Sequence, residues 1–250
     1  MTKKTGWLWA AMIGALLAAP PGAVADEVAT RSASLHTELA AQYYLLRQFA
    51  VSIDEANQAL QAVSSYAPAL NMLGLVYSEL KEYGTAEDYF RRALSAAPND
   101  SDVNHNYGVF LCRRGRTGDG VKRFEAAVRN PLYGTPEKSL VAAAECRVQG
   151  GDLASARADF SDALQRRPDY PPALAGMARL SYDDKKYLEA RAYFSRLFEV
   201  VDPYPEGLFL AAQVERQLGD AQGEARYLAQ LKKLFPKSKE AAQAANGRAE

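Results

Sequence analysis

Residue types that commonly carry chemistry are scarce in this sequence and lie far apart. The 250 residues contain two histidines, His36 and His105, and two cysteines, Cys112 and Cys146. His105 and Cys112 are seven apart and would share a helix face, but no third ligand is evident, so we expect no metal. No H-E-x-x-H, C-x-x-C or G-x-S-x-G pattern occurs at usable spacing. We therefore predict a protein that is not an enzyme and has no cofactor and no small-molecule substrate.

Two weaker signals are better explained by structure. The glycines at 115, 118 and 120 resemble a phosphate loop, but no strand precedes them, and they fall in a turn between helices. The 30 basic and 30 acidic side chains balance, so the chain lacks the basic surface that nucleic-acid binding requires. An enzyme site built from His105, Cys112 and nearby carboxylates remains the alternative. Replacing both residues without loss of function would dismiss it.

A 34-residue period organises the rest of the chain. Residues 67–100 carry apolar and small residues in the order typical of the tetratricopeptide repeat (TPR), a helix–turn–helix unit. The matching residues are Leu70, Leu73, Gly74, Tyr77, Ala86, Phe90, Ala93 and Pro98. Small residues let the two helices cross closely, larger ones fill the space around the crossing, and the proline ends the second helix. One repeat leaves its apolar face unburied, so neighbouring repeats must stack.

The same register extends in both directions and predicts an all-α superhelix, or α-solenoid, of six helix–turn–helix repeats. The repeats are predicted at 33–66, 67–100, 101–136, 137–170, 171–204 and 205–238. Five have 34 residues and the third has two more. A linker is predicted at 26–32, and a tail or capping helix at 239–250.

The first 25 residues are typical of a secretory signal peptide. Lys3 and Lys4 precede an apolar stretch from Trp7 to Ala19, and the small-x-small tripeptide 23–25 follows. The apolar stretch is short for a membrane span. We expect a cleavable signal and an exported chain; an uncleaved interfacial helix is the alternative.

Export makes a disulfide between Cys112 and Cys146 chemically reasonable. The longer third repeat offsets the two cysteines by two positions in their helices. Two positions rotate a side chain by about 200°, so thiols on adjacent helices can face each other. Two buried, unpaired thiols are the alternative.

On the first helix of each repeat, the residues at positions four, seven, eight and eleven pack inside the helix pair. The residues at positions two, five, nine and twelve form a separate stripe, rotated by about 130°, which is predicted to line an inner groove. In the N-terminal half it offers an apolar floor and hydrogen-bonding groups, which suits a peptide or helix of a protein partner. The predicted groove residues are Thr37, Ala41, Tyr44, Asn71, Leu75, Ser78, His105 and Val109. Packing of the apolar members between repeats is the alternative.

One stretch allows a closer comparison. Residues 104–112, Asn-His-Asn-Tyr-Gly-Val-Phe-Leu-Cys, resemble the N-N-Y-G-x-F-L-C stretch of the PilF/PilW family of type IV pilus biogenesis proteins. The insertion Pro131-Leu132-Tyr133, Cys146 and the segment from Tyr227 to Pro236 are also similar to that family. The resemblance implies six repeats, a location in the periplasm or at the inner face of the outer membrane, and a role in assembling or stabilising the outer-membrane secretin. Some relatives carry a disulfide, which the two cysteines here would reproduce.

The chain departs from the family at one point. Many members are lipoproteins acylated on a cysteine after the signal peptide, whereas Asp26 follows Ala25 here. No lipid anchor is expected; the chain acts as a soluble periplasmic factor, or a lipidated partner tethers it. The leading hypothesis is a pilus-assembly scaffold that binds a secretin or pilus component. A general periplasmic adaptor for envelope or polysaccharide-export machinery is the alternative.

Overall fold

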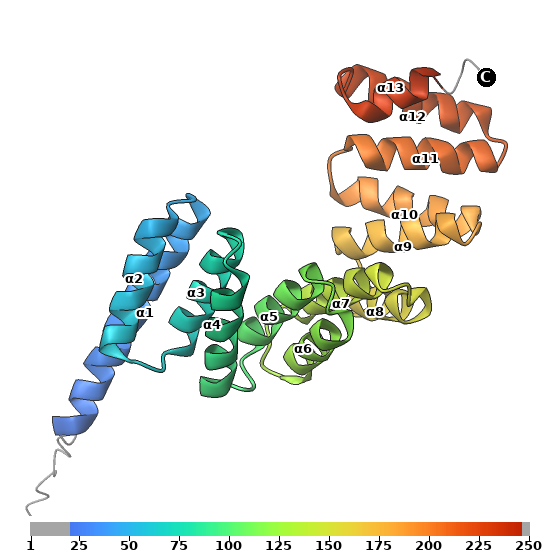
Figure 1. Cartoon of the computed structure of the whole chain (residues 1–250). Coiled ribbons are helices and arrows are strands. Elements are labelled where there is room, and N and C mark those ends of the chain that lie inside the picture. The colour runs from blue at the N-terminus through green and yellow to red at the C-terminus, as the bar shows by residue number, and fades with distance from the viewer. Residues whose placement is uncertain (1–20, 247–250) are drawn as a thin grey trace, which may run out of the picture.

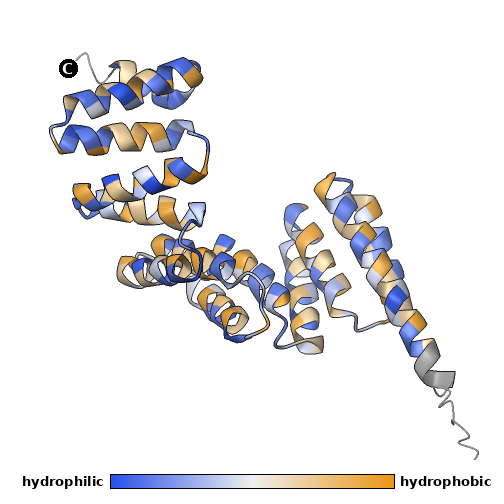
Figure 2. Ribbon diagram, turned by 180° about the vertical axis from the view of Figure 1, so that it is seen from behind, coloured by the Kyte–Doolittle hydropathy of each residue, from blue (hydrophilic) through white to orange (hydrophobic). Residues whose placement is uncertain are grey.

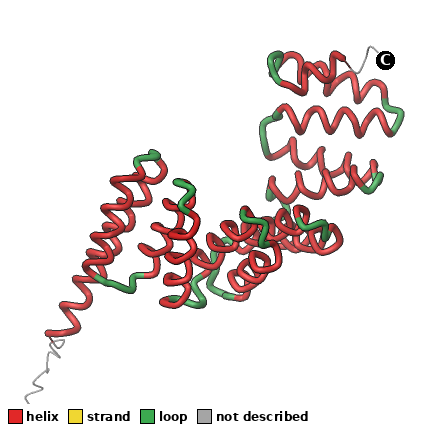
Figure 3. The backbone as a smooth tube through the Cα atoms, in the orientation of Figure 1, coloured by secondary structure: helices red, strands yellow, loops and turns green. Residues whose placement is uncertain are grey.

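The computed structural model describes residues 21–246, and within that range every regular element is a helix (Figures 1 and 3). The predicted all-α tetratricopeptide superhelix is therefore confirmed. The predicted signal peptide falls mainly on residues 1–20, outside the described residues. The helices are α1 Pro21–Leu45, α2 Phe49–Ala62, α3 Ala67–Glu79, α4 Tyr83–Ala96, α5 Ser101–Arg113, α6 Thr117–Arg129, α7 Pro136–Gln149, α8 Leu153–Arg166, α9 Pro171–Asp183, α10 Tyr187–Val200, α11 Pro205–Gln217, α12 Ala221–Leu234 and α13 Lys239–Asn246.

Six helix pairs form the array, and the same turn joins the two helices of each pair. The residue at position 15 of every repeat has a positive φ, between 57° and 81°. Glycine occupies that position in the third, fourth and sixth repeats, where it takes the left-handed conformation without steric cost. Arg47, Lys81 and Lys185 take it in the others. The next amide donates to a carbonyl five residues back, as Glu82 does to Tyr77 at 2.9 Å, and this bond closes the preceding helix.

Small residues set the close approach within a pair. A methyl group on Gly74 or Gly108 would overlap the ring of Phe90 or Phe124, respectively, on the second helix of the same repeat. Both rings are buried, at 0% and 1% exposure. A side chain at either glycine would therefore force the two helices apart.

The stacking of pairs creates an inner and an outer layer. Among the described helices, the first helices of successive repeats contact one another, from α1·α3 to α9·α11, whereas the second helices do not. Neighbours lie close on the inside of a curve and apart on the outside, so α1, α3, α5, α7, α9 and α11 form the concave layer. The array changes direction around α5–α8 (Figure 1). Apolar and polar residues alternate along most ribbons (Figure 2), as expected for helices buried on one face.

The structure corrects one prediction about the ends of the array and decides between the two alternatives of the other. Residues 26–32 were expected to form a linker, but they belong to α1. The reason is local: the stretch has no proline or glycine, and Arg31 pairs with Glu27 one turn earlier at 2.6 Å. At the other end, α13 packs against α11 and α12, so residues 239–246 form a capping helix rather than a free tail.

Candidate binding surface on the concave layer

A hollow of about 280 Å³ lies where α1, α3 and α5 meet. Five of the eight predicted groove residues line it: Tyr44, Leu75, Ser78, His105 and Val109. They come from the first helices of three successive repeats, because equivalent positions of stacked helices face the same side. The structure therefore brings most of the predicted stripe together around one concavity of mixed polarity.

The other three predicted residues do not line this hollow. The hydroxyl of Thr37 donates to the Ala33 carbonyl of its own helix at 2.7 Å. Ala41 is half-buried on α1. Asn71 is 8% exposed and accepts a hydrogen bond from Asn106 at 3.4 Å. Asn71 thus links α3 to α5 instead of offering its amide to a partner, a role that spacing alone does not reveal.

His105 lines the hollow, but its ring is engaged inside the protein. The side chain is 5% exposed, and its Nδ1 lies 2.8 Å from the hydroxyl of Ser139 on α7. The same hydroxyl lies 3.1 Å from that of Tyr133, in the insertion of the third repeat. Burial, and next the charge of Lys138, lowers the pKa of His105 to about 4, so the ring is neutral at physiological pH. His105 therefore supports the junction between the third and fourth repeats.

Charged side chains border the hollow on one side. Glu79 lies between two arginines, at 3.5 Å from Arg113 and 4.0 Å from Arg47. Burial, and next the charge of Glu79, raises the pKa of the Tyr44 hydroxyl. Tyr44 and Ser78 therefore present neutral hydrogen-bonding groups beside an ionic border. This combination suits a peptide that inserts an apolar side chain and hydrogen-bonds at its edges.

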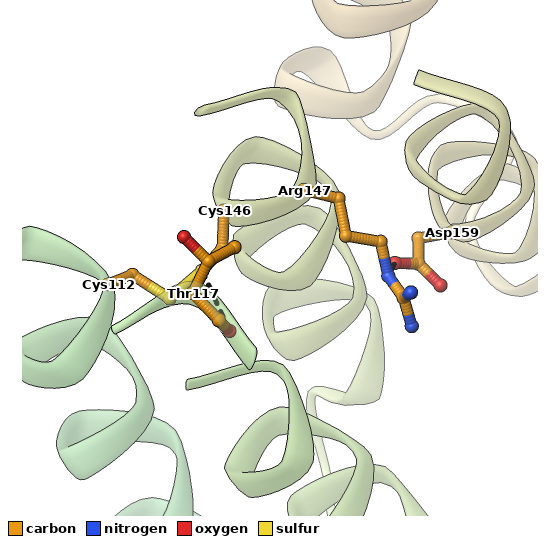
Figure 4. Close-up of a disulfide and its surroundings, with 5 residues drawn as sticks. All are labelled: Cys112, Thr117, Cys146, Arg147 and Asp159. Carbon is orange, nitrogen blue, oxygen red and sulfur yellow. Dashed lines mark hydrogen bonds and ion pairs between the residues drawn. A yellow bond between two sulfur atoms is a disulfide. The ribbon is translucent and has the colours of Figure 1, made fainter. Parts of the chain in front are cut away.

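The two cysteines are joined as a disulfide between α5 and α7, with Cα atoms 5.7 Å apart (Figure 4). That separation lies within the range that disulfides require. A methyl group on Gly120 of α6 would overlap the Cys112 sulfur, so glycine leaves the room that the bridge occupies. Next to Cys146, Arg147 turns the other way and donates from Nε to Asp159 at 2.8 Å. This bond ties α7 to α8.

A larger concavity in the C-terminal half was not among the predicted sites. A hollow of about 550 Å³ opens between α7 and α9, and a second of about 380 Å³ lies between α9 and α11. The stripe that located the first hollow, continued into repeats four to six, passes through Glu145, Val148, Ala175, Arg179 and Phe209. The same stripe spacing therefore indicates this concavity too, which lies beyond the predicted N-terminal half of the groove.

Between residues 21 and 246, no three His, Cys, Asp or Glu side chains gather as metal ligands would. None of the helices in that range combines the length and the apolar character needed to cross a bilayer.

Comparisons with known proteins agree with this architecture. Models of the tetratricopeptide repeat match residues 67–100, 111–171, 147–214 and 206–238. The type IV pilus assembly protein PilF of Pseudomonas aeruginosa is 29% identical over 185 residues, which cover 73% of this chain and 73% of PilF.

Two solved structures extend the comparison to three dimensions. The crystal structure of PilW, a widely conserved type IV pilus biogenesis factor, has a TM-score of 0.77 at 28% identity, covering 85% of this chain and 98% of PilW. A structure of P. aeruginosa PilF has a TM-score of 0.79 at 23% identity, covering 88% and 99%; at that identity it supports the fold alone. Tetratricopeptide scaffolds of this type are protein-interaction adaptors and not enzymes. The chain thus belongs to the tetratricopeptide-repeat proteins and is similar to PilF and PilW.

Proposed function

We propose that this protein is a periplasmic, non-enzymatic scaffold of type IV pilus biogenesis. In this role it assists the assembly or stability of the outer-membrane secretin by binding a secretin or pilus component on its concave layer. The observation that carries the proposal is the hollow between α1, α3 and α5 in a chain similar to proteins named for pilus assembly and pilus biogenesis.

The site proposed for the partner is the N-terminal hollow. Leu75 and Val109 supply apolar surface, while Tyr44 and Ser78 supply hydrogen-bonding groups at its edge. All four are partly accessible, unlike the buried core of each repeat. An extended or helical segment with an apolar anchor fits this arrangement. Asn71 and His105 then act indirectly, by linking α3 to α5 and α5 to α7, respectively.

The disulfide fits the proposed compartment. A bond between Cys112 and Cys146 forms and persists in an oxidising environment such as the periplasm. Export by a cleavable signal at residues 1–25 is part of the proposal. Mass spectrometry of the protein purified from the periplasm is expected to find an N-terminus at Asp26 and two fewer hydrogens than the dithiol form. An intact Met1 or two free thiols would contradict this part.

The functional test is a substitution that fills the hollow. A deletion strain would be complemented with the wild-type chain, with Ser78→Trp, or with Leu188→Ser as a control on the outer helix α10, where Leu188 is 70% exposed. We expect Ser78→Trp to reduce twitching motility, secretin multimers and co-purified pilus component, and Leu188→Ser to leave all three unchanged. A deletion strain that twitches and assembles secretin normally would instead favour a general periplasmic adaptor.

A further inference from the structure

The concavity of the C-terminal half differs in chemistry from the N-terminal hollow. Its larger hollow, between α7 and α9, is lined mainly by apolar groups, including Val148, Leu153, Phe160, Pro172 and Leu180. Val148 and Leu153 are 39% and 43% exposed, although both are aliphatic. Their exposure on a concave surface marks a place where apolar area remains available for contact.

The floor of this hollow is fixed by a small residue. A methyl group at Gly176 of α9 would overlap the ring of Phe160 on α8. Phe160 itself is 3% exposed, so the ring is held between helices and is not free to move aside. The glycine thus lets the ring lie beneath the hollow. The floor is therefore both apolar and rigid.

Glu145 adds an uncompensated negative charge to this apolar surface. Among the described residues, no basic side chain lies within ion-pair distance of its carboxylate. Arg179, which lines the same hollow, and Arg147, two residues further along α7, are used elsewhere. Arg179 is paired with Asp183 at 3.0 Å, and Arg147 points to Asp159 on α8 (Figure 4). Burial raises the pKa of Glu145, as expected for a carboxylate beside apolar walls.

The hollow is part of a longer trough. Ala175 and Arg179 line both this hollow and the next one, between α9 and α11. The trough therefore runs across three successive inner helices, and Lys239 and Gln243 of the capping helix α13 close its far end. An elongated occupant fits such a trough better than a compact one.

We propose that the trough across α7, α9 and α11 is a second docking site, which binds an extended protein segment carrying an apolar side chain next to a lysine or arginine. The apolar side chain contacts Val148 and Leu153, and the cation pairs with Glu145. Charge complementarity selects this occupant: the lining of the α7–α9 hollow holds two carboxylates and one guanidinium, whereas that of the N-terminal hollow holds one of each. The chain would then hold two different segments at once.

Synthetic peptides test this site independently of pilus function. The probes are fluorescent, end-capped heptapeptides with two leucines flanking a central lysine, glutamine or glutamate, titrated against the purified protein by anisotropy. We expect the lysine peptide to bind about fivefold more tightly than the glutamine peptide, the size of one partly shielded ion pair, and the glutamate peptide to bind more weakly still. Glu145→Gln is expected to abolish the preference for lysine. Val148→Lys, which places a cation one turn from Glu145, is expected to abolish binding.

Two controls make the result specific. Ser78→Trp and Glu79→Gln, both in the N-terminal hollow, are expected to leave the affinity for all three peptides unchanged, so that failure here is separable from failure of the proposed function. Unfolding followed by circular dichroism checks that each variant is folded. Absence of binding by all three peptides, or a lysine preference that survives Glu145→Gln, would overturn the proposal.

Discussion

The junction between the third and fourth repeats and the junction between the fifth and sixth join similar helix pairs by different means. At the first, a disulfide connects α5 to α7, and His105 bonds to Ser139. At the second, Arg191 of α10 pairs with Glu215 of α11 and lies 3.2 Å from Asp220. Phe198 packs on Tyr204 and Tyr227 beside them.

The difference coincides with the length of the repeats. The third repeat has two residues more than the others, and the extra length lies in the loop that carries Pro131, Leu132 and Tyr133. The offset places Cys112 and Cys146 opposite each other and lets Tyr133 reach Ser139. We infer that a register change between repeats is held by the disulfide and the His105–Ser139 hydrogen bond in addition to an ion pair, that of Arg147 with Glu125, whereas the regular junction relies on ionic and aromatic contacts.

Breaking the disulfide is expected to have the largest effect on stability. The bond closes a loop of 34 residues, and the chain-entropy model gives a contribution of about 3–4 kcal/mol. Reduction should therefore lower the melting temperature by roughly 10 °C. Thermal unfolding with and without reductant measures this difference. The double variant Cys112→Ala/Cys146→Ala is the control, and a reductant effect of equal size in that variant would show that the bond is not its cause.

Acid should weaken the same junction through His105. Its pKa is about 4 in the folded protein against about 6.5 for an ordinary histidine in the unfolded chain. Between these pH values the unfolded chain binds more protons, so stability falls as the pH falls from 6.5 to 4. The loss amounts to at most about 3 kcal/mol below pH 4. His105→Asn should flatten this dependence in urea unfolding measured across that range; an unchanged slope would contradict the assignment.

The regular junction should respond to Arg191→Met. Glu215 is 3% exposed, and removing its partner leaves a buried charge uncompensated. Because the Arg191 side chain is itself 36% exposed, we expect a loss of about 1–2 kcal/mol, less than for a fully buried pair. Urea unfolding measures the loss, and Arg191→Met/Glu215→Gln should restore part of it. A single variant as stable as the wild type would mean that the aromatic contacts alone hold this junction.

The smallest effect is expected at the turn that all repeats share. Lys81 has a φ of 64° and Gly151 one of 81°, at the same position of two repeats. Lys81→Gly should stabilise the protein by about 0.5–1 kcal/mol because glycine accepts this conformation freely, and Gly151→Ala should destabilise it by about the same amount. Equal stability of both variants and the wild type, measured by chemical unfolding, would contradict the shared geometry.

These comparisons show what the sequence determines by itself. The period of small and large residues was enough to predict the helix pairs, because Gly74 and Phe90 must meet wherever two helices cross closely. The stripe predicted that Leu75, Ser78 and Val109 lie together, because equivalent positions of stacked first helices face the same side. Burial of His105 and Asn71 was not predictable, because it depends on Ser139 and Asn106 in later helices. The extension of α1 through 26–32 was missed because the end of the apolar leader suggested a boundary where helix-forming residues continue.

The most direct test of the central claim, that the N-terminal concave hollow binds the pilus partner, is site-specific cross-linking in living cells. A photo-reactive amino acid would replace Ser78 on the inner helix α3 or Leu188 on the outer helix α10. We expect a secretin or pilus subunit, identified by mass spectrometry, in the adduct formed from position 78 and not in that from position 188. Adducts of equal yield at both positions, or an adduct at position 78 that contains no pilus component, would contradict the claim.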